Sequence, residues 1–509
     1  MSMNFFRTAA GVSAFTCVMV AAAPAGALPL AATGPSTNVS PYILPASDAV
    51  NVTSLLTVDE KDRPDPGVDM VGIPDGLGAY RQGRNLVLLM NHEFVATAGE
   101  VHDHGETGAF VSRNVIDPVT GRVKKTGDLI QDVAYYDYAT GAYVPAPTSG
   151  TPQFNRFCSG SLSDPGALYD KHSKSGYRGQ FYFGNEEINP EGRTFAVTKD
   201  GLATQLPRLG LFSWENTLVA DTRDDETVVI GTDDNVSGQL RIYVGEKQRK
   251  GSAVDKAGLT NGELHVLDVK DQTITTDAGY RTAYGAGQQV PVKAKQVDWD
   301  ATGAVQETEA VARGLTLNRI EDGAFDPKHP NDFYFLTTEG GDTASRENDP
   351  DTGAPITRDG GGLWRLRFAD VSRPSAGMTL ELLLDGTEAP HLNKPDNMDI
   401  DERGHLLIQE DPGGNAHLAR VLAYEIASGD IATLAQFDPT HFASGATGDP
   451  DPATTDEESS GIIDVADLMG RGTFLLDAQI HTSAGLSDPG RQVEHGQLLR
   501  MKVNWGEVF

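Results

Sequence analysis

Apolar residues along the chain gather in short runs that end in polar or acidic clusters. The runs are rich in β-branched and aromatic residues and lack the three- and four-residue spacing of helices, so they predict strands. Six runs share this form: Leu86 to Glu93, Phe181 to Glu187, Val228 to Asp234, Phe333 to Glu339, Leu406 to Asp411 and Phe474 to His481. The repetition indicates one structural unit used six times.

In most cases the run follows a shorter segment that begins at a polar residue and leads into a turn. These segments are Ile73 to Gly78, Cys158 to Leu162, Trp214 to Val219, Glu321 to Pro327, Asp396 to Asp401 and Glu458 to Asp464. A third strand usually follows, beginning at Gly108, Gly238, Gly362, Ala419 or Gly496. Three or four strands repeated six times predict an all-β fold, a six-bladed β-propeller with long inter-strand insertions. The competing hypothesis is a β-sandwich, or two packed sheets with polar strand ends.

Two longer segments between the repeated units, Asp117 to Asn155 and Thr275 to Arg313, contain Gly, Pro and Thr in quantity and predict surface excursions. No clean linker divides the chain. We therefore expect a single propeller domain over residues 71–509, preceded by a lead-in segment over residues 28–70.

In a propeller the innermost strand of each blade lines the central channel, so the polar residues that open the first strands would face one another. These residues are Asp75, Cys158, Glu215, Glu321, Asp396 and the Glu457-Glu458 pair. Carboxylates this close raise one another's pKa until they protonate, unless a cation is bound between them. The convergence therefore predicts a metal site.

The residue types indicate which ions such a site would hold. A thiolate favours iron, zinc or a similar ion, whereas carboxylate, Asn and backbone carbonyl oxygens suit calcium or magnesium. The ends of the second strands supply the oxygen donors: Glu93, Glu186 with Glu187, Asp233 with Asp234 and Asn235, and Glu410 with Asp411. Taken alone, each of these motifs is also typical of an ordinary strand end or turn.

The first residues have the pattern of a secretory signal peptide. Arg7 precedes an apolar run from Ala9 to Val20, and the small-residue stretch Ala25-Gly26-Ala27 follows. We expect residues 1–27 to be removed, with cleavage near Ala27, and the protein to be periplasmic or secreted. No later stretch approaches the roughly 20 consecutive apolar residues of a membrane helix, so we expect no membrane partner.

Composition narrows the classes of partner further. A net charge of -31 argues against nucleic-acid binding, which needs a basic surface. An apolar content of 39% favours a folded, acidic-surfaced protein over a disordered chain. Because Cys17 lies in the signal, Cys158 is the one cysteine of the mature chain and has no partner for an internal disulfide. It is a buried filler, a reactive thiol or a metal ligand.

Several motifs occur in an order that resembles the PhoX-type alkaline phosphatases. They are MNHE ending at Glu93, the isolated Cys158, NEE ending at Glu187, LGLFSWEN from Leu209, TDD ending at Asp234, RIEDG from Arg319, PDN from Pro395 and DEESSG from Asp456. The resemblance covers most of the mature chain, from about Val71 onward.

That resemblance implies a six-bladed propeller with a mixed iron and calcium cluster at one end of the channel, hydrolysing phosphate monoesters. The ligands that it implies near the iron pair are Glu93, Cys158, Glu215, Glu321 and Asp396. It implies that Arg319 contacts the phosphate and acts in catalysis with Glu321. Two residues apart, Arg319 and Glu321 would lie on the same face of a strand. It implies calcium ligands at Glu186, Glu187 and Asp233 or Asp234. The signal has no twin arginine, which the family commonly uses for export with metals already loaded.

The leading hypothesis is thus a metal-dependent phosphomonoesterase, a monomer that acts on a small phosphate ester. A second hypothesis keeps the metal cluster but hydrolyses phosphodiesters, phosphotriesters or phytate. A third, from a different class, is a non-catalytic propeller that is stabilised by calcium and binds a protein or glycan. A lactonase-type calcium propeller is a further alternative, but it leaves the thiol of Cys158 without a role.

Overall fold

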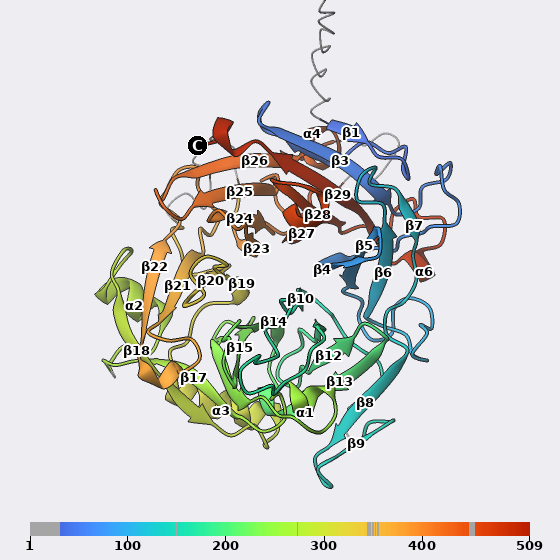
Figure 1. The fold of residues 1–509 in the computed structure, drawn as a ribbon. Helices are drawn as coiled ribbons and strands as arrows, with labels where there is room; N and C mark the ends of the chain where they lie inside the picture. The colour runs from blue at the N-terminus through green and yellow to red at the C-terminus, as the bar shows by residue number, and fades with distance from the viewer. Residues whose placement is uncertain are drawn as a thin grey trace, which may run out of the picture.

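The computed structural model describes residues 31–509 apart from positions 149, 272, 344–347, 349–350, 352, 354–355 and 447–453. The predicted signal peptide, residues 1–27, lies outside the described residues. Most of the regular structure is β, and Figure 1 shows the sheets arranged around a common centre. No helix in the described part of the chain is long and apolar enough to cross a bilayer.

The first two sheets follow the chain order of the predicted repeat. One contains β4 (Pro74–Gln82), β5 (Asn85–His92), β6 (Phe110–Ile116) and β7 (Val123–Lys125). The next contains β10 (Ser161–Leu162), β11 (Phe181–Asn185), β12 (Thr194–Thr198) and β13 (Leu202–Gln205), with β8 (Asp132–Asp137) and β9 (Ala142–Val144) at its outer edge.

A nine-stranded sheet combines two further four-stranded units. The first unit is β14 (Trp214–Val219), β15 (Glu226–Asp233), β16 (Arg241–Glu246) and β17 (Glu263–Val269). The second is β19 (Ile320–Phe325), β20 (Asp332–Thr337), β21 (Gly362–Phe368) and β22 (Met378–Leu384). Strand β18 (Val290–Val297) pairs with β17 on one side and with β22 on the other, which makes the two units one sheet.

The last two sheets recruit strands from the beginning of the chain. One holds β23 (Pro395–Ile400), β24 (His405–Glu410), β25 (Arg420–Glu425), β26 (Ile431–Phe437) and β2 (Ile43–Pro45). The other holds β27 (Glu457–Asp464), β28 (Thr473–Ile480), β29 (His495–Val503), β3 (Val50–Thr57) and β1 (Ala31–Thr33). The predicted lead-in, residues 28–70, therefore does not stand apart from the sheets, because β3 pairs with β29.

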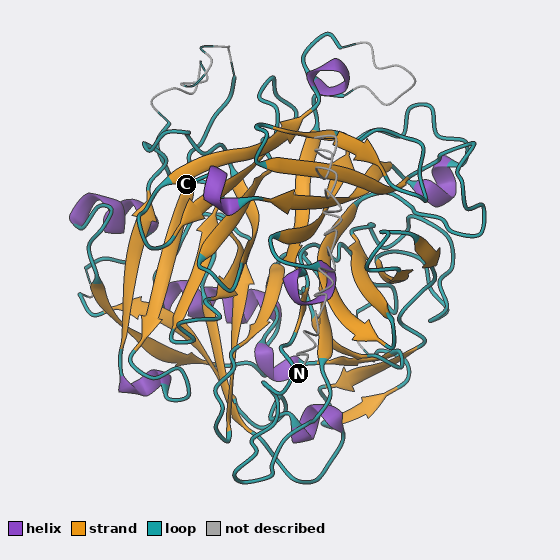
Figure 2. Ribbon diagram, turned by 45° about the horizontal axis from the view of Figure 1, so that its top comes forward, coloured by secondary structure: helices purple, strands orange, loops and turns teal. Residues whose placement is uncertain are grey.

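Short helices lie in the connections between strands (Figure 2). They are α1 (Ala253–Lys256), α2 (Asp277–Ala283), α3 (Gly303–Arg313), α4 (Pro439–Phe442), α5 (Ala466–Met469) and α6 (Pro489–Gln492), with 3-10 turns η1 (Pro207–Leu209), η2 (Pro374–Ala376) and η3 (Trp505–Glu507).

The innermost strands of the four-stranded units form a closed cycle. In order, β4, β10, β14, β19, β23 and β27 each contact the next, and β27 returns to β4 (Figure 1). The approach is close enough to require glycine: a Cβ atom on Gly76 of β4 would lie 1.9 Å from the backbone nitrogen of Gly160. The polar residues that open these strands therefore meet at one end of a central channel.

Apolar side chains fill the spaces between neighbouring sheets. One cluster joins Leu56 of β3 and Leu498 of β29 to Leu77 and Leu88 of the adjacent sheet. Each fully buried Leu contributes about 1.5 to 3 kcal/mol relative to an exposed one. Packing between sheets thus fixes the ring of inner strands.

The predicted strands are confirmed, and the predicted excursions need correction. Residues 362–368, for example, form β21 as expected. The segment from Asp117 to Asn155 holds β7 to β9, and that from Thr275 to Arg313 holds α2, β18 and α3. The excursion prediction is wrong for β18: Val290 and Val292 are buried and alternate with Pro291 and Lys293, a strand pattern that the Gly, Pro and Thr content of the whole segment outweighed.

Candidate metal centre

A break in the strand register presents the acidic side chains at the end of the channel. In β4, β14, β19 and β23 the pairing with the second strand shifts across two residues. The residues within the shifts are Asp75-Gly76, Glu215-Asn216, Glu321-Asp322 and Asp396-Asn397. Such bulges are common beside active sites, because they redirect a side chain that the regular strand would turn away.

In three of the four shifts the second residue is polar, and these side chains form a hydrogen-bonded layer next to the acidic residues. Asn216 Nδ2 donates to Asp322 Oδ1 at 2.7 Å and to Ser159 Oγ at 3.3 Å. Asn397 Nδ2 donates to Ser159 Oγ and to Asp75 Oδ1, both at 3.3 Å. These bonds join the inner strands across the channel and hold the acidic residues above them.

Three overlapping groups of side chains could each hold an ion. The groups are Asp75, Glu93 and Cys158; Cys158, Glu187 and Glu215; and Glu215, Glu321 and Asp396. Within each group the potential ligand atoms lie within 4.8 Å of one another. Since consecutive groups share Cys158 or Glu215, the seven residues form one continuous row with a single sulfur among carboxylate oxygens.

Burial makes this row electrostatically costly without a cation. The pKa is raised well above its ordinary value by burial first and by a neighbouring carboxylate second in Asp75, Glu215, Glu321 and Asp396. Burial and the adjacent Asp75 also raise the pKa of the Cys158 thiol. Within the described chain Glu215 Oε1 is buried and has no hydrogen-bond partner. A buried, unpaired oxygen among like charges is the environment that a metal ion stabilises.

Two arginines supply positive charge at different points of the row. Arg156 Nη2 lies 2.6 Å from Glu93 Oε1 and also pairs with Glu187. Arg319 Nε and Nη2 each lie 2.8 Å from Asp234, and Nη2 lies 3.3 Å from Glu321 Oε1. The prediction that Arg319 lies on the face of a regular strand is wrong. Its φ of 56° places it in the left-handed region just before β19. The contact with Glu321 forms through that turn instead.

A histidine completes the surroundings of the sixth inner strand. His481 Nδ1 lies 2.8 Å from Glu494, and its Nε2 lies 3.4 Å from Glu458 of β27. Burial lowers the pKa of His481, but the bonds to these two carboxylates outweigh it and raise the pKa to about 11. Gln479 Nε2 in turn donates to Asp75 at 3.2 Å and to Glu458 at 3.5 Å.

The structure brings together most of the ligands predicted from sequence and leaves two aside. Glu93, Cys158, Glu187, Glu215, Glu321 and Asp396 are in the groups above, and Asp234 is tied to them through Arg319. Glu186 is not, since its carboxylate is held by Arg193 Nε at 2.6 Å and Nη2 at 2.7 Å. Asp233 is not either, since it pairs with buried Arg241 at 3.1 Å. Both carboxylates lie outside the three groups, each in an ion pair with an arginine, and their assignment as calcium ligands stays a prediction.

Sequence reasoning also missed two members of the site. Asp75 was placed in the ring but was not among the ligands that the resemblance implied, although it groups with Glu93 and Cys158. Arg156 was not singled out at all. The available signal was its spacing, because it precedes Cys158 by two residues as Arg319 precedes Glu321.

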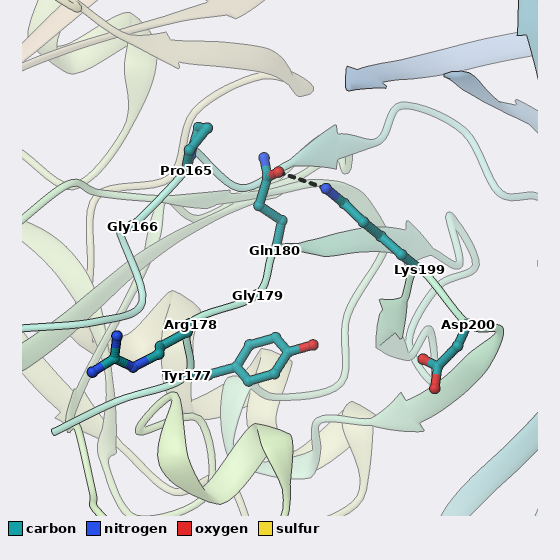
Figure 3. A pocket seen from close by; sticks show the side chains of 8 residues that line it. All are labelled: Pro165, Gly166, Tyr177, Arg178, Gly179, Gln180, Lys199 and Asp200. Atoms are coloured by element: carbon teal, nitrogen blue, oxygen red, sulfur yellow. Dashed lines mark hydrogen bonds between the residues drawn. The ribbon is translucent and has the colours of Figure 1, made fainter. Parts of the chain in front are cut away.

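A cavity on the inner strands and a pocket beside it lie away from the ligand row. The cavity has a volume of 660 Å³ and is lined by the opposite stretch of the inner strands, including Leu77, Leu218, Ala324 and Ile462. A neighbouring pocket of 370 Å³ is bordered by Tyr177, Arg178 and Lys199 (Figure 3). Lys199 there donates to Gln180 and stacks over the Tyr80 ring. Neither cavity is lined by a residue of the three groups.

Comparison with solved structures finds proteins of similar fold. PhoX of Pseudomonas fluorescens, solved in complex with vanadate, a transition state analogue, matches with a TM-score of 0.61 at 13% identity. The match covers 94% of this chain and 97% of that one, and it shows a shared fold. A soluble aldose sugar dehydrogenase from Escherichia coli matches with a TM-score of 0.32 at 8% identity, over 89% of this chain and 100% of that one. No curated protein sequence matches the chain.

The family model described as alkaline phosphatase PhoX matches residues 186–465, which is more than half of the chain. That span includes Glu187, Glu215, Glu321 and Asp396 of the ligand row, and Arg319 beside it. On this match, the chain belongs to the PhoX alkaline phosphatase family.

Proposed function

We propose that this protein is a metal-dependent phosphatase that hydrolyses phosphate monoesters at the row of ligands on a six-bladed propeller. The observation that carries the proposal is the row itself: seven potential ligands converge where the inner strands begin, in a member of a phosphatase family. The closed cycle of six inner strands supports the propeller.

The residues present suit a mixed set of ions. Cys158, with its sulfur between Asp75 and Glu215, fits a transition metal such as iron, whereas the all-oxygen group of Glu215, Glu321 and Asp396 fits calcium. Bound ions would neutralise phosphate oxygens, activate water and stabilise the charge that develops as the ester bond breaks.

Arg319 is the residue that we assign to the substrate phosphate. Its side chain is 30% exposed, and its guanidinium already forms a two-pronged contact with the carboxylate of Asp234. The same planar fork matches two phosphate oxygens. Glu321, beside it, would hold an ion and orient Arg319 through their contact at 3.3 Å.

Location and assembly complete the proposal. The apolar N-terminal pattern supports export to the periplasm or the medium, with cleavage near Ala27, and the protein is proposed to act there as a monomer. A secretory route without a twin-arginine signal means that the ions are captured outside the cytoplasm.

The direct test combines metal analysis with hydrolysis. Purified mature protein, loaded with calcium and iron, is assayed with p-nitrophenyl phosphate and bis(p-nitrophenyl) phosphate, and its metal content is measured by mass spectrometry. We expect bound metal, turnover of the monoester in preference to the diester, and loss of turnover with chelator. A metal-loaded protein that hydrolyses neither compound, or a protein that binds no metal, would refute the proposal.

A further inference from the structure

One backbone position recurs at the entrance to the inner strands. Arg156, Arg319 and Lys394 each precede a residue of the ligand row by two positions, and their φ angles are 52°, 56° and 48°. Ile73 holds the same position before Asp75, with φ 45°. The left-handed region is uncommon for residues other than glycine and persists only where the surroundings enforce it. Its recurrence marks a repeated device, and in three of these four units the residue is a cation.

Two of these three cations form ion pairs with residues of the ligand row. Arg156 pairs with Glu93 and Glu187, which belong to the first and second ligand groups. Arg319 pairs with Asp234 and with Glu321 of the third group. The charge of Lys394 acts on Asp411, next to the row.

Arg156 and Arg319 serve different parts of the row. Arg156 forms ion pairs with Glu93 and Glu187, whereas Arg319 forms them with Asp234 and Glu321. The two sets share no member, so the two arginines do not compete for one carboxylate. Each is also accessible to a ligand, because the side chains are 42% and 30% exposed.

We propose that Arg156 binds a second anionic group of the substrate, so that the preferred esters carry a carboxylate or another phosphate on the leaving group. The inference rests on the proposed function, in which Arg319 takes the phosphate that is transferred. A protein with a net charge of -31 repels a multiply charged anion, and a local guanidinium fork offsets that repulsion.

The test compares two esters of similar size, phosphoglycolate and ethyl phosphate, which differ in one carboxylate. The measured quantity is the ratio of their kcat/KM values. We expect the wild-type ratio to favour phosphoglycolate and Arg156→Gln to reduce the ratio about tenfold or more, as expected for loss of a charge-assisted contact. Arg319→Lys should lower both values and keep the ratio.

Lys394→Gln is the matched control, because it removes one positive charge from the equivalent position of another unit. We expect its ratio to stay within about twofold of wild type. An equal fall in Lys394→Gln and Arg156→Gln would overturn the proposal, since general positive charge would then set the preference. Metal content is measured in each variant. If Arg156→Gln loses metal, Arg156→Lys is tested instead. We expect the ratio of kcat/KM values to fall about threefold in that variant, because lysine lacks the fork.

Titration calorimetry with two non-hydrolysable ligands measures binding independently of activity. Phosphonoacetate carries the additional carboxylate and methylphosphonate lacks it. We expect wild type to prefer phosphonoacetate and Arg156→Gln to lose that preference. Hydrolysis of both esters with an unchanged ratio in metal-loaded Arg156→Gln would overturn the inference and leave the phosphatase standing. Hydrolysis of neither ester, with an Arg156-dependent preference for phosphonoacetate, would refute the phosphatase and retain the second anion site.

Discussion

Cys158 Sγ lies 3.3 Å from Asp75 Oδ2 and donates a hydrogen bond to it across the gap between two neighbouring inner strands. Burial and the charge of Asp75 keep the thiol protonated by raising its pKa. A proton therefore joins these two residues in the metal-free protein, at a point where an ion can take its place.

Cys158→Ser should leave the fold intact and remove most of one metal and most of the activity. A hydroxyl of similar size can keep the bond to Asp75 but is a poor substitute for a thiolate ligand. Metal analysis, circular dichroism and turnover of p-nitrophenyl phosphate check this. Full activity with unchanged metal content would show that Cys158 is a buried filler.

Removal of metal should lower both activity and thermal stability, and calcium should restore stability. Bound ions stabilise the native state by linkage. The raised pKa values of Asp75, Glu215, Glu321 and Asp396 also give the metal-free protein a pH dependence. Their folded pKa lies above the unfolded one, so their contribution is present below the unfolded pKa and is lost as pH rises.

The melting temperature of the chelated protein should therefore fall between mildly acidic and neutral pH more steeply than that of the loaded protein. Melting curves with and without chelator at several pH values measure this difference. Parallel pH profiles would argue against a row of uncompensated carboxylates.

Glu186→Gln and Glu187→Gln form a matched pair of neighbours with opposite expected effects. Glu186 is held by Arg193, so its loss breaks a buried ion pair and should cost about 3 to 5 kcal/mol of unfolding free energy with metal content unchanged. Glu187 belongs to a ligand group, so its loss should reduce bound metal. Denaturant unfolding and metal analysis of both variants check the contrast, and a metal loss confined to Glu186→Gln would reverse the assignment.

Arg319→Lys should reduce turnover by roughly 10- to 1000-fold while bound metal is unchanged. Lysine keeps the charge and loses the fork, and a charge-assisted contact of this kind contributes about 2 to 4 kcal/mol in the transition state, with about 1.4 kcal/mol for each tenfold. Steady-state kinetics and metal content measure the two effects. If the variant loses metal or unfolds while its remaining kinetics are normal, Arg319 is a structural partner of Asp234.

Glu410 should support stability at neutral pH through a buried network rather than through metal. It accepts from Arg420 at 2.8 Å and lies 2.9 Å from His417 Nε2. Burial acts against the carboxylate, yet these partners lower its pKa from 4.5 to about 2. Its contribution is thus complete above about pH 4.5 and is lost as pH falls through 2.

Glu410→Gln should lower the free energy of unfolding by about 3 to 5 kcal/mol at pH 7 and flatten its dependence on pH below 4.5. Denaturant unfolding at pH 7 and at acidic pH provides the measurement. A variant as stable as wild type at pH 7 would show that the network contributes nothing.

The repeat was visible in the sequence because a buried strand needs a run of apolar residues and a strand end needs polar ones. That rule placed Asp75, Glu215, Glu321 and Asp396 at equivalent positions, and the structure brings them together. The same rule cannot separate Glu186 from Glu187. Successive side chains of an extended chain face opposite ways. Which of the two glutamates turns away from the ligand row depends on Arg193, which lies seven residues after Glu186, just before β12, and binds its carboxylate.

The left-handed backbone just before the inner strands could not be predicted from the sequence, for a different reason. Arg156 adopts a left-handed backbone, which residue type alone does not predict for arginine. The register shifts in the inner strands were equally hidden, because they arise from tertiary packing around the channel.

Pairing of β3 with β29 has a consequence for biosynthesis. Gln497 Nε2 bonds Thr57 Oγ1 across 440 positions of sequence, so one of the earliest strands to be synthesised finds its partner among the last. Contacts this distant form late in folding, and N-terminal segments leave the ribosome first. A translation product that stops short of β29 would leave β3 and β28 without the strand that pairs with both. Incomplete chains would then carry all seven residues of the ligand row on sheets with open edges, and open edges favour aggregation.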